Sequence, residues 1–307
     1  MIVLTLFVLA LFAALALPWL MPRPGLDGDI PDQPFADSHF SEIEGVRLHY
    51  RLRPAEPEGD ALIVLLHGFG GSSFSWRHSL DALEKAGHGA IAIDLPPFGY
   101  SQRSSQGPDW ASLVGGLIDE VAPGKQLVLV GHSMGAGVAA RLTARRSGQV
   151  KQLILVAGTP RMRGRQQGPG LALVNRVPAL GRWAEVLAAH RLVSEEQIGQ
   201  MLTSAFGREP DSEELAGYFH PLTIPGTYPA LLQRMATESE QDAEGWQTVP
   251  TLLIWGEEDR WVPLSSGETL LEQYPDLTLH RMPGTGHNPM DTEVDAFNVI
   301  LVDALMR

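Results

Sequence analysis

Short apolar runs alternate with helical stretches along most of this chain, and no other feature limits its fold as strongly. Each run is too short for a helix and carries almost no polar side chain, as expected for a strand buried on both faces. The runs lie at residues 61–66, 90–93, 126–130 and 152–156. The helical stretches lie at residues 74–86, 109–121 and 134–146. This alternation predicts an α/β fold, in which a mostly parallel sheet carries helices on both faces.

The alternation stops at Gly158 and returns at Thr251. The interval has no clear buried strand, and its apolar residues recur with helical spacing instead. These helix-like stretches lie at residues 181–190, 195–205 and 227–238. The sheet and helix pattern then resumes at residues 251–255, 264–273, 277–281 and 291–306. We therefore predict a core of residues 43–158 and 249–307 that is interrupted by a helical cap, residues 159–248.

The first twenty residues differ from the rest, because Met1–Leu20 contains no charged side chain. Twenty residues at the helical rise span roughly 30 Å, the thickness of a bilayer core. We expect an N-terminal transmembrane helix that anchors the protein to a membrane. Residues 21–42 are rich in Pro, Gly and Asp and are expected to form a linker. Arg23 is the only basic residue nearby, so the side of the membrane is weakly determined.

Two other interpretations of Met1–Leu20 stay open. The triplet Ala14-Leu15-Ala16 resembles the cleavage site of a signal peptide, and cleavage there would leave a secreted or periplasmic protein. The usual basic residue before the apolar region of a signal peptide is missing. A helix buried within the domain is the third interpretation.

The charge and the cysteine content exclude several classes of protein. A net charge of −13 argues against a nucleic-acid partner, which usually meets a basic patch. The chain has no cysteine, which excludes disulfides, thiolate catalysis and Cys-ligated metals. It has no H-E-x-x-H spacing and no phosphate-binding loop, so we expect neither a metal ion nor an organic cofactor. The sequence leaves the oligomeric state open.

Ser133 lies in the strongest motif of the chain, Gly131-His132-Ser133-Met134-Gly135. The motif directly follows a predicted strand and directly precedes a predicted helix. A G-x-S-x-G segment in that context forms a sharp turn that exposes the serine hydroxyl above the sheet. Its glycines avoid clashes with neighbouring backbone. A chance turn of small residues is the alternative, but the placement favours a nucleophile.

A second glycine-rich segment, His-Gly-Phe-Gly-Gly-Ser at residues 67–72, follows the predicted strand at 61–66. An enzyme that transfers acyl groups stabilises an oxyanion with backbone N–H groups. We expect one such group from Met134, the residue after the nucleophile, and another from Phe69 in this loop. A simple glycine-rich turn is the alternative.

An acid and a histidine follow the last two predicted strands, in the chain order serine, acid, histidine. Three carboxylates compete in Glu257-Glu258-Asp259. Asp259 lies furthest into the loop and is preferred, with Glu258 next. Only His280 and His287 follow it in the chain. His280 falls within a predicted strand and His287 in a loop, so His287 is the expected general base, oriented by Asp259.

Together these segments resemble the α/β-hydrolase fold, and within it the large subgroup that carries a cap. The resemblance is carried by residues 66–77, 94–101 and 255–259, and it extends over residues 45–158 and 249–305. The subgroup includes esterases, C–C bond hydrolases, cofactor-free haloperoxidases, haloalkane dehalogenases and epoxide hydrolases. The last two use an Asp nucleophile, so Ser133 argues against both activities.

The resemblance implies a serine hydrolase (class EC 3.1.1) that cleaves a carboxylic ester or related acyl bond of a small molecule through an acyl-enzyme. Two alternatives stay open. One is a C–C bond hydrolase of a vinylogous diketone acid, and the other is a catalytically inactive binding module on the same fold. The C–C hydrolase needs a basic cap residue to hold the substrate carboxylate. The candidates are Arg161, Arg163, Arg165, Arg176 and Arg182.

Large aromatic residues close to the motifs are candidates for an acyl pocket. We expect Trp76, Phe98 and Trp261 to bind substrate, since each lies beside one of the predicted loops. Packing in the core is the alternative for all three.

Overall fold

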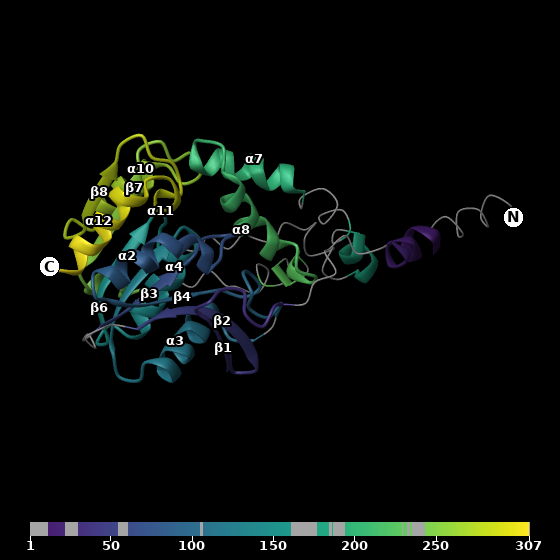
Figure 1. Cartoon of the computed structure of the whole chain (residues 1–307), viewed down its shortest axis with the longest axis horizontal. Helices are drawn as coiled ribbons and strands as arrows, with labels where there is room; N and C mark the ends of the chain where they lie inside the picture. The colour runs from purple at the N-terminus through teal and green to yellow at the C-terminus, as the bar shows by residue number, and fades with distance from the viewer. Residues whose placement is uncertain are drawn as a thin grey trace, which may run out of the picture.

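The computed structural model describes residues 12–21, 30–54, 61–104, 107–160, 177–183, 194–228 and 243–306, together with residues 186, 230, 231 and 234. Most of these residues form three layers, in which helices lie on both sides of a central sheet (Figure 1). The C-terminus lies at one end of the molecule and the N-terminal helix at the other (Figure 1).

The described strands form an 8-stranded sheet in the order β1-β2-β4-β3-β5-β6-β7-β8. They are β1 (Ser38–Ile43), β2 (Val46–Arg53), β3 (Ala61–Leu66), β4 (Gly89–Ile93), β5 (Gln126–His132), β6 (Val150–Val156), β7 (Thr251–Gly256) and β8 (Thr278–Met282). The pairs from β4 to β8 run parallel, while β1 and β2 are antiparallel at one edge. This confirms the predicted mostly parallel sheet. The loops after β3, β5, β7 and β8 therefore gather at the carboxyl edge of the sheet.

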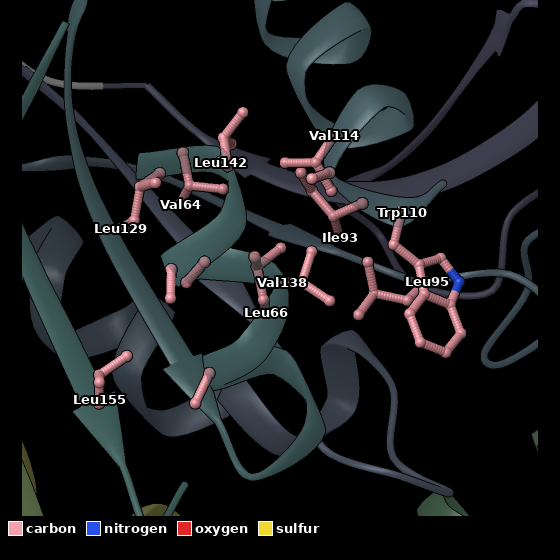
Figure 2. Packing of buried hydrophobic residues seen from close by; sticks show 14 of the residues in the cluster. Val64, Leu66, Ile93, Leu95, Trp110, Val114, Leu129, Val138, Leu142 and Leu155 are labelled. Carbon is pink, nitrogen blue, oxygen red and sulfur yellow. The ribbon is translucent and has the colours of Figure 1, made fainter. Parts of the chain in front are cut away.

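Helices pack on both faces of the sheet through separate apolar clusters. One cluster joins α2 (Arg77–Lys85) and α12 (Val294–Leu305) to the strands. The other joins α3 (Trp110–Val121), α4 (Met134–Arg145) and α10 (Leu264–Gln273) to them. Figure 2 shows part of the second cluster, in which strand side chains such as Val64 and Leu129 lie beside Leu142 of α4. Each fully buried side chain of this size contributes about 1.5–3 kcal/mol by leaving water, so both faces hold the sheet firmly.

Most predicted elements are present, and two begin and end at the predicted residues, β3 and α10. The stretch predicted as one helix at 74–86 is a 3-10 turn, η1 (Ser73–Trp76), followed by α2. The predicted closing helix is likewise divided into α11 (Pro289–Thr292) and α12. The sheet begins at Ser38, inside the stretch predicted as a linker.

Two helices are described in full between β6 and β7, α7 (Glu195–Phe206) and α8 (Ser212–Leu222). Figure 1 shows both beyond the end of the sheet. The Ser194 side chain caps α7 by accepting the N–H of Gln197, and α8 begins with a reciprocal capping box between Asp211 and Glu214. The predicted helix at 195–205 is therefore present, whereas α8 was not predicted. The predicted helix at 227–238 lies largely outside the described residues.

The N-terminal segment corrects one prediction. The described helix there covers residues 12–20, and residues 1–11 lie outside the described residues. No helix in the part of the chain that the structure describes is long and apolar enough to cross a membrane. This finding overturns the predicted transmembrane helix over Met1–Leu20 and the membrane location inferred from it.

Candidate active site

Ser133 lies at the sharp turn between β5 and α4. Its backbone has a φ of 49° and a ψ of −113°, a region that non-glycine residues rarely adopt. Its N–H donates to Val156 O at 2.9 Å, which ties the turn to β6. The side chain is partly exposed at the carboxyl edge of the sheet. The strained strand–turn–helix geometry that the G-x-S-x-G motif predicts is thus present.

Three glycines allow backbone to pass close to this turn. A Cβ on Gly131 would overlap the backbone of Gly135, and a Cβ on Gly158 would lie 2.5 Å from Ser133 O. A Cβ on Gly135 would lie 2.6 Å from His67 O. The loop after β3 therefore packs directly on the first turn of α4, which no larger residue at these positions would permit.

The two predicted oxyanion-hole residues, Phe69 and Met134, lie on loops that meet beside Ser133. Met134 is the first residue of α4, where backbone N–H groups have no partner within the helix. Gly68, next to Phe69, lies so close to the nucleophile that an added Cβ would be 3.1 Å from Ser133 Cβ. The ring of Phe69 is 46% exposed and meets Phe98 edge-on, with centroids 5.5 Å apart. Nearly half of Phe69 is therefore open to solvent.

His67 fixes the shape of the loop that carries Phe69. Its Nδ1 lies 2.7 Å from Gly68 O, and its Nε2 accepts the N–H of Leu95 at 2.9 Å. One ring nitrogen donates while the other accepts, which only a neutral imidazole can do. Burial lowers the pKa of His67 below its ordinary value, so the ring stays neutral and the loop keeps both contacts.

Asp94, at the end of β4, ties the same loop to the antiparallel edge of the sheet. Its Oδ1 accepts the N–H of Ser73 at 2.5 Å, and its Oδ2 accepts the N–H of Tyr100 at 2.7 Å. His49 of β2 approaches the same Oδ2 with Nδ1 at 2.7 Å. Burial pushes the pKa of Asp94 upward, but His49, His67 and the N–H of Ser73 together outweigh it and lower the pKa to about 2. The carboxylate is therefore ionised at neutral pH.

Asp259 and His287 are in contact at the ends of β7 and β8. Asp259 Oδ2 lies 2.7 Å from His287 Nδ1, and both side chains are buried. Asp259 Oδ1 accepts the N–H groups of Trp261 and Val262 at 2.8 and 2.9 Å. A carboxylate only accepts, so the shared proton sits on Nδ1 and leaves Nε2 of the ring with a free lone pair. The competing carboxylates Glu257 and Glu258 are exposed.

Two further rings enclose His287. His132, the neighbour of Ser133, lies with its ring centroid 4.8 Å from that of His287, and its Nε2 is 2.9 Å from His287 O. Trp261 also stacks on His287, with ring centroids 5.4 Å apart and an interplanar angle of 28°. Burial first, and then the neighbouring His287, hold the pKa of His132 well below its ordinary value. His132 is therefore a neutral donor to the His287 carbonyl.

The three predicted substrate-binding residues have different surroundings. Trp261 is 39% exposed beside His287. Phe98 is fully buried but contacts Phe69 at the rim of the site. Trp76 is fully buried and packs against Phe297 of α12, in the core cluster beneath α2. The structure thus brings Trp261 and Phe98 to the site and leaves Trp76 in the core.

His49 and Asp94 form a buried pair away from Ser133. Across the described ranges, no group of three or more His, Asp or Glu side chains is arranged to hold a metal ion. The buried His49 uses both ring nitrogens, since Nδ1 contacts Asp94 and Nε2 contacts Ser38 Oγ at 2.8 Å. This pair acts as a tie between β1, β2 and β4.

Sequence reasoning missed the cap residues that contact the His287 loop. Ala205 of α7 accepts the N–H of His287 at 2.8 Å, and Ser204 Oγ lies 3.1 Å from Trp261 Nε1. Tyr218 of α8 contacts Asp291, four residues after His287. The glycine at 286 was the one available sign, because a Cβ there would lie 2.5 Å from Ala205 O.

Comparison with known proteins gives a consistent result for the core. A family model described as "Alpha/beta hydrolase family" matches residues 63–299. The uncharacterised hydrolase YugF of Bacillus subtilis is 29% identical over 255 residues, which cover 80% of this chain and 89% of that protein. A 2-hydroxy-6-oxononadienedioate/2-hydroxy-6-oxononatrienedioate hydrolase of Pseudomonas is 28% identical over 269 residues, covering 81% of this chain and 89% of the relative.

Solved structures share the same architecture at lower identity. Bromoperoxidase from Bacillus anthracis superposes with a TM-score of 0.69 at 19% identity, over 88% of this chain and 100% of that one. An esterase from Exiguobacterium antarcticum superposes with a TM-score of 0.68 at 21% identity, over 87% of this chain and 99% of that one. These similarities concern the fold, which hosts several chemistries.

Proposed function

The chain belongs to the alpha/beta hydrolase family, and from this premise we propose that it is a serine hydrolase of carboxylic esters or related acyl bonds. In this proposal Ser133 is the nucleophile, His287 the general base and Asp259 the residue that orients His287. The observation that carries it is the buried 2.7 Å contact between Asp259 and His287, next to the strained turn at Ser133. Nothing in ligand binding alone would require that arrangement.

The proposed reaction begins when Ser133 Oγ attacks the substrate carbonyl carbon and His287 Nε2 takes the hydroxyl proton. Asp259 holds the ring by its Nδ1–H and stabilises the imidazolium that forms. His287 then gives the proton to the leaving alcohol, and the acyl group stays on Ser133. A water molecule attacks this ester through the same base, which releases the acid and restores the hydroxyl.

The oxyanion of each tetrahedral intermediate needs donors that are already in place. We assign this role to the backbone N–H groups of Met134 and Phe69. The start of α4 adds the positive end of the helix dipole on the same side. His67 and Asp94 support the proposal, because their buried hydrogen bonds hold the loop of Phe69 against the nucleophile turn.

A C–C bond hydrolase is the second candidate, and the similarity to the 2-hydroxy-6-oxononadienedioate/2-hydroxy-6-oxononatrienedioate hydrolase of Pseudomonas favours it. This reaction would need a cap arginine for the substrate carboxylate. Arg161, Arg163, Arg165 and Arg176 lie outside the described residues. Arg182 is buried and donates to Pro18 O and Met21 O of the N-terminal segment at 3.1 and 3.4 Å. Those contacts argue against a role for Arg182 in substrate binding.

Variants of Ser133 and a substrate panel test the proposal together. The panel holds p-nitrophenyl esters from acetate to palmitate and one 2-hydroxy-6-oxo-dienoic acid. We expect ester hydrolysis by the wild type, labelling of Ser133 by a fluorophosphonate, and a fall in kcat of about 10⁴-fold or more for Ser133→Ala, by analogy with removal of a serine nucleophile. Ser265→Ala, on the exposed surface of α10, is the control and should keep its activity.

Other outcomes point elsewhere. Turnover of the dienoic acid with negligible ester hydrolysis would favour the C–C bond hydrolase. A Ser133→Ala variant that keeps a tenth of the wild-type rate would refute Ser133 as nucleophile. Absence of both turnover and labelling in the wild type would favour the binding module.

A further inference from the structure

The main chain of His287 is held by two different parts of the molecule. Its C=O accepts a hydrogen bond from Nε2–H of His132, which belongs to the core. Its N–H donates to Ala205 O, which belongs to α7 of the cap, at 2.8 Å. The peptide group on the N-terminal side of the proposed base is therefore fixed by the cap and the one on its C-terminal side by the core.

The end of α7 is suited to this contact. Carbonyls in the last turn of a helix have no partner within the helix. Thr203 O accepts a hydrogen bond from the N–H of Gly207, the left-handed C-cap residue. Ala205 O accepts the hydrogen bond from the N–H of His287. The C-terminal end of a helix also carries partial negative charge, which favours a neighbouring imidazolium. Gly286 permits the approach, since its position leaves no room for a Cβ beside Ala205 O.

A second cap contact reaches the same loop from α8. The hydroxyl of Tyr218 is buried and lies 2.5 Å from Asp291 Oδ2, 2.9 Å from Ser75 Oγ and 3.3 Å from Asn288 Nδ2. A phenol has one proton, and the carboxylate of Asp291 is the strongest acceptor of the three, so Tyr218 donates to Asp291. Asn288, the residue after His287, then donates to the phenol oxygen.

The charges around Tyr218 are balanced, so this contact is stable in a buried setting. Arg77 Nη1 pairs with Asp291 Oδ1 at 2.6 Å. Arg208 pairs with Glu214 through two bonds of 2.7 and 2.8 Å, and it also donates to Asp291 O at 3.3 Å. Arg77 of α2 thus holds α11 through Asp291, and Arg208 connects α8 to the same segment. The Arg77–Asp291 pair is largely buried, and removing one partner of such a pair costs about 3–5 kcal/mol.

We propose that Tyr218 is a positioning residue for His287, acting through Asp291 and Asn288, and that α7 and α8 hold the base in its working position. This inference rests on the proposed function, in which His287 is the base. It assigns to the cap a part in the chemical step, besides any part in shaping the substrate pocket. A displacement of a catalytic group by about 1 Å can lower a rate about 100-fold, so loss of this support is measurable.

Tyr218→Phe removes a single oxygen atom and tests the proposal directly. We expect kcat for a short p-nitrophenyl ester to fall about 10- to 100-fold, KM to change by less than about threefold, and the rate of fluorophosphonate labelling at Ser133 to fall with kcat. Tyr50→Phe is the matched control, because Tyr50 is also buried but lies on β2 at the far edge of the sheet, with its hydroxyl near Ser41. Its kcat should stay at the wild-type value.

A second variant and a double mutant separate positioning from general loss of structure. Asn288→Ala cuts the same link at the His287 side and should also lower kcat. The double variant should lose little more than Tyr218→Phe alone, because residues that act in one chain are not additive. Multiplied losses, or an unchanged kcat in either single variant at an unchanged melting temperature, would overturn the proposal.

A spectroscopic measurement keeps this result distinct from a failure of the proposed function. The proton shared by His287 Nδ1 and Asp259 should give a low-field NMR signal in the wild type at low temperature. We expect that signal to shift or broaden in Tyr218→Phe and to stay in place in Tyr50→Phe. This readout needs no substrate. An inactive wild type would refute the hydrolase proposal, whereas an unmoved signal in Tyr218→Phe would refute the role of Tyr218.

Discussion

At the scale of single residues, Asp259 differs from its two acidic neighbours by its burial and its partners. Two backbone N–H groups fix one of its oxygens and leave the other for His287. Glu257 and Glu258 point to solvent. The sequence alone ranked the three carboxylates only by their distance into the loop. The folded chain adds the backbone donors that select one of them.

Asp259→Asn is expected to lower kcat about 10⁴-fold while leaving the fold intact. The carboxamide oxygen of the new Asn side chain can still accept the hydrogen bonds from the N–H groups of Trp261 and Val262. The NH₂ group of that side chain then faces His287. The ring must then accept at Nδ1 and carry its proton on Nε2, so it cannot take the proton of Ser133. Steady-state kinetics and thermal unfolding test this. Glu258→Gln serves as control, and a larger loss in that variant would show that the wrong carboxylate was chosen.

At the scale of elements, the buried strands and the cap helix α7 were predictable, whereas the edge strand β1 and the cap helix α8 were not. β3 is one continuous apolar run, so its two ends are visible in the sequence. β1 is an edge strand with one neighbour and a mixed burial pattern, and it carries no such run. α8 contains Gly217 and Pro221, which usually argue against a helix. Asp211 and Glu214 form a capping box that marks its start, but its packing on Phe74 of η1 leaves no local pattern.

The apolar N-terminus shows the same limit of local patterns. Hydropathy measures the length of an uncharged run, and it ignores what the residues contact. In the structure Ala14 O accepts Nε1–H of Trp183 at 2.8 Å, and Pro18 O accepts from Arg182. The described helix at 12–20 thus packs against the cap through partners that lie far along the chain.

Replacing either of two glycines in the cap helices by alanine should change the melting temperature, in opposite directions. Replacing glycine by alanine within a helix gains up to about 1 kcal/mol in propensity. At Gly199 of α7 the new Cβ would meet only Leu215 Cδ1 at 3.8 Å, so Gly199→Ala should raise the melting temperature. At Gly217 of α8 the new Cβ would overlap the ring of Phe74, so Gly217→Ala should lower it. Calorimetry of both variants decides the matter, and a stabilised Gly217→Ala would contradict the close packing of α8 on η1.

At the scale of the whole molecule, Asp94 connects parts that are distant in sequence. Its carboxylate joins β2 through His49, the turn η1 through Ser73 and the loop after β4 through Tyr100. The chain order of the proposed triad was readable from motifs, because strands and loops alternate regularly. The contacts of Asp94 could not be predicted from motifs, because they depend on β2 and β4 lying side by side in the sheet. Unfolding the domain breaks all of these contacts at once.

The pKa of Asp94 predicts how stability depends on pH. In the folded protein it lies at about 2, below the ordinary 3.8. A lowered pKa stabilises the fold fully above pH ~3.8 and loses the effect as pH falls toward 2. At ~1.36 kcal/mol per pKa unit this contribution is about 2 kcal/mol at pH 7 and about half of that at pH 3.

Urea unfolding of the wild type and Asp94→Asn at several pH values measures this contribution. The difference in unfolding free energy between the two proteins should be largest at pH 7 and should shrink below pH 4. His88→Gln, on a residue outside this tie, is the control for the effect of a substitution away from Asp94. A difference that stays constant from pH 7 to pH 3 would show that the charge of Asp94 contributes nothing.

The contact between Ala205 O and His287 N–H also affects how such a protein can diverge during evolution. Ala205 offers only its main chain, so mutation can change the side chain at this position while the hydrogen bond is inherited. If recombination replaces a cap segment that includes residues up to Phe206, the new segment must contain a helix that ends at the same place. If the replaced segment ends before Thr203, the hydrogen bond is unaffected. Selection for this hydrogen bond therefore acts on where the helix ends, and it does not act on the side chain of Ala205. Lineages that keep this bond therefore need no fixed residue at position 205, whereas position 286 must stay without a side chain.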